Sequence, residues 1–206
     1  MKAYKFLLPG AVGPFSRVVW PRPYAGMTGS WVAAEDGATV LCRTAVHACR
    51  VEHLPWWLQD DLWEIEVAEP VRLSGHKLMS PRGRLLRRVD AWDGAAARAF
   101  ARACAFRAGG HAVAALDRAG ARAAAAQLRS CADLEMLLST ARALDVPEPA
   151  RVSVTMAGDG AVRAIAGHAA TCAYIGAHSA RQLGGDAAMR GERAWQAQWL
   201  AGRLGL

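Results

Sequence analysis

The chain has 206 residues, 53% of them hydrophobic, so it can bury a core of one large or two small domains without disulfides or metals. Its formal net charge is +7. Residues 1–90 hold 12 basic and 9 acidic side chains and residues 91–206 hold 13 and 9, so neither half is an extreme basic module of the kind that binds nucleic acid.

Targeting signals are not evident in the sequence. The opening residues lack the apolar stretch of about 7–15 residues that a signal peptide needs. No run approaches about 18 consecutive apolar residues, so we expect no membrane span and no membrane partner. Five cysteines are an odd number without the spacing of a secreted disulfide framework, and we expect a reducing, cytoplasmic location.

The first 90 residues are interrupted by seven prolines, which exclude long helices. Between them lie short runs with strand-forming composition at residues 3–8, 17–20, 39–42, 45–49, 62–67 and 85–89. Residues 63–67 alternate apolar and acidic side chains, as a strand with one solvated face does. Residues 54–62 are expected to form one short helix, because Pro55 is tolerated in a first turn.

After Asp93 the composition becomes rich in alanine. We expect helices over residues 95–107, 122–144 and 160–183, with Gly109 and Gly110 interrupting the first, and a last helix capped by Asp186. The predicted fold class is therefore α+β: a small, mostly antiparallel β domain over residues 1–90, followed by an alanine-rich helical bundle over residues 91–206.

Cysteine and histidine gather in one short segment. Cys42, His47, Cys49 and His53 follow the pattern C-x4-H-x-C-x3-H, and strand alternation places His47 and Cys49 on one face. A zinc ion needs four such ligands, or three and a water. We therefore consider these four residues as metal ligands, with zinc as the metal, although the spacing differs from the common zinc motifs.

Two other interpretations of the same residues stay open. A cysteine beside an imidazolium has a lowered pKa, so His47 and Cys49 are candidate catalytic residues of a thiol-dependent enzyme. Alternatively, Cys42 and Cys49 are small buried hydrophobic residues and His47 makes one backbone hydrogen bond. The structural interpretation is favoured, because no third group that would orient the histidine is identifiable.

Residues 1–90 resemble an uncharacterised phage and bacterial domain. The resemblance is carried by the start Lys2-Ala3-Tyr4-Lys5, by the segment from Cys42 to Val46-His47-Ala48-Cys49 and by the later strand around Ile65. The domain typically has Gly and Phe where this chain has Ala45 and Val46. It has no established activity, so the resemblance implies the domain limits and the importance of Cys42, His47 and Cys49, and no reaction.

Two weaker patterns complete the search for chemistry. Glu64 and Glu66 form an E-x-E arrangement reminiscent of NAD-using ADP-ribosyltransferases, although no matching Arg strand precedes it. Residues 81–88 form a basic run with four arginines, but its interleaved leucines offer no platform on which bases stack, so nucleic acid is an unlikely partner.

We expect a non-enzymatic interaction or assembly protein, because no complete catalytic set is visible and alanine-rich helices pack closely against other helices. Its partner would be a protein, including a second copy of this chain that associates through residues 161–180. The alternative is a metal-binding or thiol-dependent enzyme centred on Cys42, His47 and Cys49.

Overall fold

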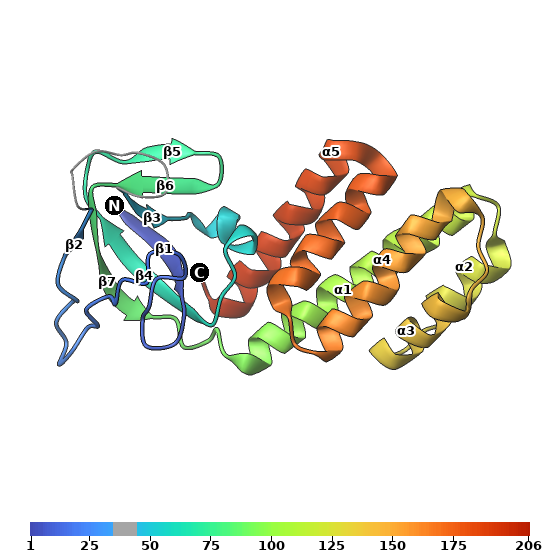
Figure 1. The fold of residues 1–206 in the computed structure, drawn as a ribbon, viewed down its shortest axis with the longest axis horizontal. Helices are drawn as coiled ribbons and strands as arrows, with labels where there is room; N and C mark the ends of the chain where they lie inside the picture. Colours follow the sequence, from blue (N-terminus) through green and yellow to red (C-terminus); the bar gives the residue numbers. More distant parts are fainter. Residues whose placement is uncertain (35–44) are drawn as a thin grey trace. The chain divides into compact units, whose positions relative to one another are not determined.

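The computed structural model describes residues 1–34 and 45–206, which divide into two compact units. The first is Met1–Asp93 together with Leu200–Leu206, and the second is Gly94–Trp199. Antiparallel strands dominate the first and helices the second (Figure 1), which confirms the predicted α+β fold class. The domain limits at residues 90 and 91 stay a prediction about independent folding.

The first unit contains two antiparallel sheets. The four-stranded sheet has the order β1 (Lys2–Leu7), β4 (Asp61–Val67), β7 (Arg82–Arg88), β2 (Val32–Ala33). The three-stranded sheet has the order β3 (Val46–Ala48), β6 (Lys77–Ser80), β5 (Arg72–Ser74). Tyr4 and Cys49 exchange two backbone hydrogen bonds of 2.8 Å, which join β1 to the residue that follows β3.

Alternation along the strands produces the core of this unit. Ala3 and Leu7 of β1 and Ile65 and Val67 of β4 are at most 1% exposed, as inward-facing positions of a strand should be. Together with Trp20, Val46, Ala48, Trp63, Leu78 and Leu85 they form one hydrophobic cluster. Burying these side chains is the main force that holds the two sheets together.

Four of the six predicted strand runs coincide with strands, namely β1, β3, β4 and β7. The run at residues 17–20 does not form a strand: Arg17 has φ of 59°, and within the run only Val19 makes a bridge, to Val12. The run at 39–42 lies outside the described residues. The helix predicted over residues 54–62 is wrong in its limits: a 3₁₀ helix, η1, spans Val51–Trp56, and β4 begins at Asp61.

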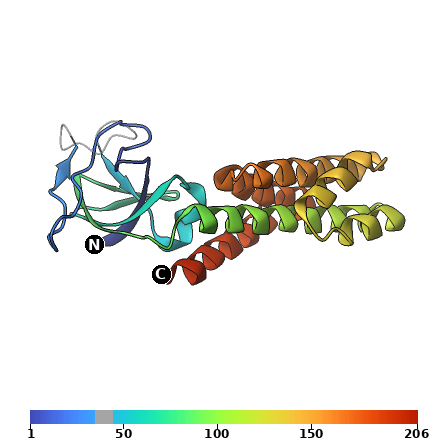
Figure 2. The same cartoon turned by 90° about the horizontal axis from the view of Figure 1, so that it is seen from below.

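The second unit consists of helices, with bounds α1 (Gly94–Arg118), α2 (Arg122–Arg129), α3 (Leu134–Ala143), α4 (Glu148–Ile165) and the part of α5 (Ala169–Leu204) that precedes Leu200. Helices α1 and α4 pack side by side (Figures 1 and 2), and α3 packs against α4. None of the helices in residues 1–34 and 45–206 combines the length and apolar character that crossing a bilayer requires.

Small residues allow α1 to run unbroken through the glycines expected to interrupt it. A Cβ on Gly109 would lie 3.2 Å from Cδ1 of Leu137, so the missing side chain lets α3 pack directly on α1. A helical glycine costs about 1 kcal/mol relative to alanine. Burial of Leu137, which is 1% exposed, outweighs that cost.

The predicted helices at 122–144 and 160–183 are each divided. Asp133 caps α3 by accepting a 2.7 Å hydrogen bond from the amide of Met136, which separates α3 from α2. Gly167, with φ of 77°, ends the turn between α4 and α5. The predicted break at residues 184 and 185 is present: Gly184 and Gly185 have non-helical angles and divide α5 into two helical segments.

Gly29 tests the packing of the first unit. Its amide donates to the carbonyl of Leu85, and a Cβ at this position would clash with the carbonyl oxygen of Pro21. We expect Gly29→Ala to lower the free energy of unfolding by about 2–3 kcal/mol, because backbone must move. Gly26→Asn is the control: Gly26 has φ of 80° and open space around it, which asparagine tolerates. Equal urea midpoints for the two variants would contradict the predicted clash.

Candidate functional site

Three of the four predicted ligands lie in the described residues, around the end of β3. His47 is in β3, Cys49 follows it, and His53 is in η1. Cys42 lies outside the described residues. Among residues 1–34 and 45–206, no group of three or more His, Cys, Asp or Glu side chains is placed to hold a metal ion. His47, Cys49 and His53 therefore do not form a zinc site with one another.

Lys5 lies near both candidate catalytic residues. Its amine donates a 2.7 Å hydrogen bond to the backbone carbonyl of His47 and lies 5.1 Å from the ring centre of Trp20. Burial lowers the pKa of Lys5 to about 8. The carbonyl and the indole face together hold the ammonium group where water is scarce, which is a structural role.

Cys49 does not have the properties of a nucleophile. Its residue is 2% exposed, and burial raises the pKa of its thiol to about 12 although the charge of Lys5 acts in the opposite direction. A thiolate attacks and a thiol does not, so these surroundings disfavour Cys49 as a nucleophile. The thiol-dependent interpretation requires a thiol with a lowered pKa, and the pKa of Cys49 is raised instead.

The surroundings of His47 do not favour a cation, and the rings of His53 and His76 pack against each other. The pKa of His47 is lowered by burial and by the charges of Lys5 and Lys77, so its imidazole is neutral but faces two ammonium groups. The ring of His53 packs edge-on against that of His76, with centroids 5.1 Å apart. His76 in turn stacks on Trp56 at 3.9 Å. These rings contribute packing area to the junction of η1 with the β5–β6 turn.

The E-x-E carboxylates are bound by cations of the sheet. Glu64, only 5% exposed, pairs with Lys2 at 2.8 Å and with Arg87 at 2.6 Å, and these partners lower its pKa. Glu66 pairs with Arg84 at 2.6 Å. The two carboxylates hold β1, β4 and β7 together, and neither is free to hold a ribose. The face of β4 that was expected to be solvated is buried at Glu64, where Lys2 and Arg87 bind the carboxylate.

The same pairs neutralise most of the basic run at residues 81–88. Arg84 and Arg87 are bound as described, and Arg88 pairs with Asp61 at 2.7 Å. Phosphate binding needs cations whose charge is not already compensated. Arg82 is the exception, since no carboxylate of the described residues lies within ion-pair distance of it.

A buried charge cluster in the helical unit was not found from the sequence. The side chain of Glu192 in α5 is 1% exposed and binds Arg107 of α1 through three contacts of 2.6–2.9 Å. Gln196 donates to the carbonyl of Ala173 at 2.9 Å, and Arg193 donates to Gln196 at 2.9 Å. One signal was available: Glu192 and Gln196 precede Leu200 by eight and four residues, and so share its buried helix face.

This cluster joins helices and does not resemble a catalytic centre. The guanidinium of Arg107 is held between the carboxylate and the ring of Trp195, whose centre is 4.1 Å away. His111 lies 3.7 Å from the same carboxylate, and burial lowers its pKa. The carboxylate is buried and held by a bidentate partner, which favours a structural role over general-base catalysis.

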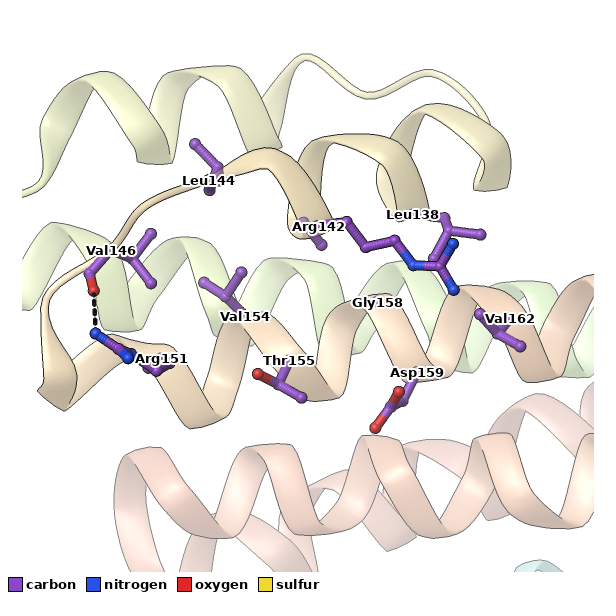
Figure 3. Close-up of a pocket in the computed structure, with 11 residues that line it drawn as sticks. Leu138, Arg142, Leu144, Val146, Arg151, Val154, Thr155, Gly158, Asp159 and Val162 are labelled. Atoms are coloured by element: carbon purple, nitrogen blue, oxygen red, sulfur yellow. Dashed lines mark hydrogen bonds between the residues drawn. The ribbon is translucent and has the colours of Figure 1, made fainter.

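A shallow pocket of about 270 Å³ lies between α3 and α4 (Figure 3). Its walls combine apolar side chains, among them Leu138, Leu144 and Val146, with the charged side chains of Arg142, Arg151 and Asp159. Arg151 is committed to Glu148 at 2.8 Å. Neither a cysteine nor a histidine lines this pocket, and its charges are of both signs, so it does not define a reaction.

Exposed apolar side chains are concentrated in the turns between β1 and β2. Of the twelve large apolar side chains that are exposed in the described residues, six lie between residues 15 and 31: Phe15, Val18, Val19, Tyr24, Met27 and Trp31. Phe15 is 83% and Tyr24 80% exposed. Contiguous or clustered exposed apolar groups mark interaction sites more often than single ones do.

These turns are held by backbone hydrogen bonds. Tyr24 and Met27 exchange two, of 3.1 and 2.9 Å, across a two-residue turn in which Ala25 and Gly26 have positive φ. In the preceding turn the amide of Gly13 donates to the carbonyl of Val18 at 2.8 Å. Apolar side chains are therefore displayed on fixed backbone.

Comparison of the chain with protein-family models, with curated proteins and with solved structures finds no match.

Cys49 provides a direct test of the thiol interpretation. We expect iodoacetamide at about pH 7.5 to leave Cys49 unmodified in the native protein, because its thiol is buried and protonated. In about 8 M urea, a denaturing concentration, the reagent should modify Cys49 fully. Peptide mapping by mass spectrometry reads each cysteine separately. Half-buried Cys131 is the internal control. Rapid native modification of Cys49 would restore the thiol-dependent interpretation.

Glu192 tests the buried charge cluster. Glu192→Ala removes a buried carboxylate and leaves the partly exposed Arg107 without its partner, and we expect a loss of about 1–3 kcal/mol in the free energy of unfolding. The control is Glu148→Ala, which removes the exposed pair with Arg151 and should cost less than about 1 kcal/mol. Urea unfolding followed by helical circular dichroism measures both. Similar losses for the two variants would contradict a structural role of the cluster.

Proposed function

We propose that this chain is a non-enzymatic interaction protein whose binding surface lies on the turns between β1 and β2. The observation that carries the proposal is the concentration of exposed apolar side chains between residues 15 and 31, on turns fixed by backbone hydrogen bonds. Exposed apolar area on an ordered backbone binds a partner with little loss of conformational entropy.

The enzymatic alternatives lack supporting chemistry. Cys49 has a raised thiol pKa, Glu64 and Glu66 are bound by cations, and the described residues hold no three-ligand metal group. The four cysteines in the described residues are free thiols, three of them buried, which supports the cytoplasmic location expected from the sequence.

A second copy of this chain is the other candidate partner. Ile165 and Tyr174, both in the alanine-rich stretch 161–180, are 47% and 55% exposed, which favours association through the helical unit. Sedimentation velocity at tens of micromolar, about the range in which weak dimers form, separates this possibility from binding at the turns.

The test uses the full chain immobilised on beads and a lysate of the native host. We expect a retained protein that is lost when Tyr24→Ser and Met27→Ser are combined, because these side chains are 80% and 66% exposed and their loss should leave the fold intact. The matched control combines Met136→Ser and Val152→Ser, which are 43% and 54% exposed in the helical unit.

Circular dichroism verifies that both double variants are folded. Retention that falls at least about tenfold in the Tyr24 and Met27 variant, and stays unchanged in the control, supports the proposal. If every retained protein binds both variants equally, the turns are not the binding surface.

A further inference from the structure

The hairpin surface, which we define as Arg22, Tyr24, Met27, Trp31 and Arg82, has a charge as well as an apolar character. We propose that its partner is an acidic protein segment that carries carboxylates beside apolar side chains. This inference rests on the proposed function and specifies the chemistry of the partner.

Within residues 1–34 and 45–206, no carboxylate pairs with the cations of this region. Residues 1–34 contain no Asp or Glu, whereas Arg17 and Arg22 are exposed in the turns. No carboxylate of the described residues lies within ion-pair distance of either arginine. A surface with cations and without carboxylates attracts an anionic partner and repels a basic one.

Arg82 is the residue best placed to bind a carboxylate. Its neighbours on β7 are committed, Arg84 to Glu66 and Arg87 to Glu64, each at 2.6 Å. Arg82 instead lies over the ring of Trp31, 5.0 Å from its centre. The indole restrains the guanidinium without consuming its hydrogen-bond donors, so these donors are available to a carboxylate at low entropic cost.

The apolar part of the surface lies within the same footprint. Trp31 follows Met27 by four residues, a span of at most about 14 Å. One side of a standard interface covers about 800 Å², which is wide enough to include both. The backbone between Met27 and Trp31 is attached to β7, because the amide of Gly29 donates a 2.9 Å hydrogen bond to the carbonyl of Leu85.

The observations favour a protein over a nucleic acid or a membrane. Single-stranded nucleic acid binds by stacking successive bases on several aromatic faces, but the guanidinium groups of Arg82 and Arg84 already lie over the Trp31 ring, which leaves Tyr24 as the open ring of the hairpin surface. Anionic membranes attract clusters of about 4–8 basic residues, whereas Arg17, Arg22 and Arg82 are three arginines without an ion pair in the described residues.

The test selects binders without assuming their identity. A phage-displayed library of random 12-residue peptides is panned against the immobilised full chain, and enriched peptides are synthesised with a fluorescein label. Fluorescence anisotropy then gives Kd for the unsubstituted chain, for Arg82→Gln, and for Arg72→Gln. Arg72 is the matched control, an exposed arginine on β5 for which the described residues hold no ion-pair partner.

We expect peptides rich in Asp and Glu beside aromatic or aliphatic residues, with Kd weakened about tenfold by Arg82→Gln and unchanged by Arg72→Gln. Their affinity should also fall as salt rises from about 50 to 300 mM. Enriched peptides without acidic residues, which lose binding in the Tyr24→Ser and Met27→Ser variant but not in Arg82→Gln, would overturn the acidic partner and leave the proposed function standing.

Two further outcomes count against the inference. If no enriched peptide depends on Tyr24 and Met27, both the acidic partner and the proposed binding surface are rejected. The same titration is run with fluorescein-labelled oligothymidine and with phosphatidylglycerol vesicles. Tighter binding of either probe than of any peptide, lost in Arg82→Gln, would assign the surface to nucleic acid or to a membrane instead.

Discussion

The pairing of β4 with β1 on one side and β7 on the other is the constraint on which the first unit depends. Ile65 and Val67 fill the core from one face of β4, while Glu64 and Glu66 on the opposite face bind cations from the two neighbouring strands. Because Glu64 and Glu66 are bound in these ion pairs within the sheet, their carboxylates are unavailable for catalysis. Arg82, which has no ion pair within the described residues, and the apolar turns remain available to a partner.

The helical unit is organised by the opposite means. Small side chains let its helices approach closely, as at Gly109, and one carboxylate, that of Glu192, is buried where large hydrophobic residues are scarce. A buried ion pair adds little net stability compared with apolar packing. It does disfavour other packing arrangements of the helices, because a shifted helix would leave the buried carboxylate without its cation. The pair therefore serves to fix which faces of α1 and α5 meet.

The sequence predicted local features better than distant ones. The strand β4 and the glycine break at residues 184 and 185 are properties of neighbouring residues, and both are present, although Glu64 on the face expected to be solvated is buried. Continuity of α1 through Gly109 depends on Leu137, and burial of Glu192 depends on Arg107, 85 residues away. No local pattern contains such partners. The properties of the candidate site could not be predicted for the same reason, because the pKa of Cys49 depends on its burial and on the charge of Lys5, which is distant in sequence.

The first unit is discontinuous in sequence, since Leu200–Leu206 belongs to it together with Met1–Asp93. Leu200 and Leu204 are 0% and 7% exposed. During synthesis, therefore, the first unit gains its last residues only after all of Gly94–Trp199 has been made. The order of maturation runs against the order of the sequence: the unit that is made first is finished last, and its exposed apolar turns are present throughout that interval.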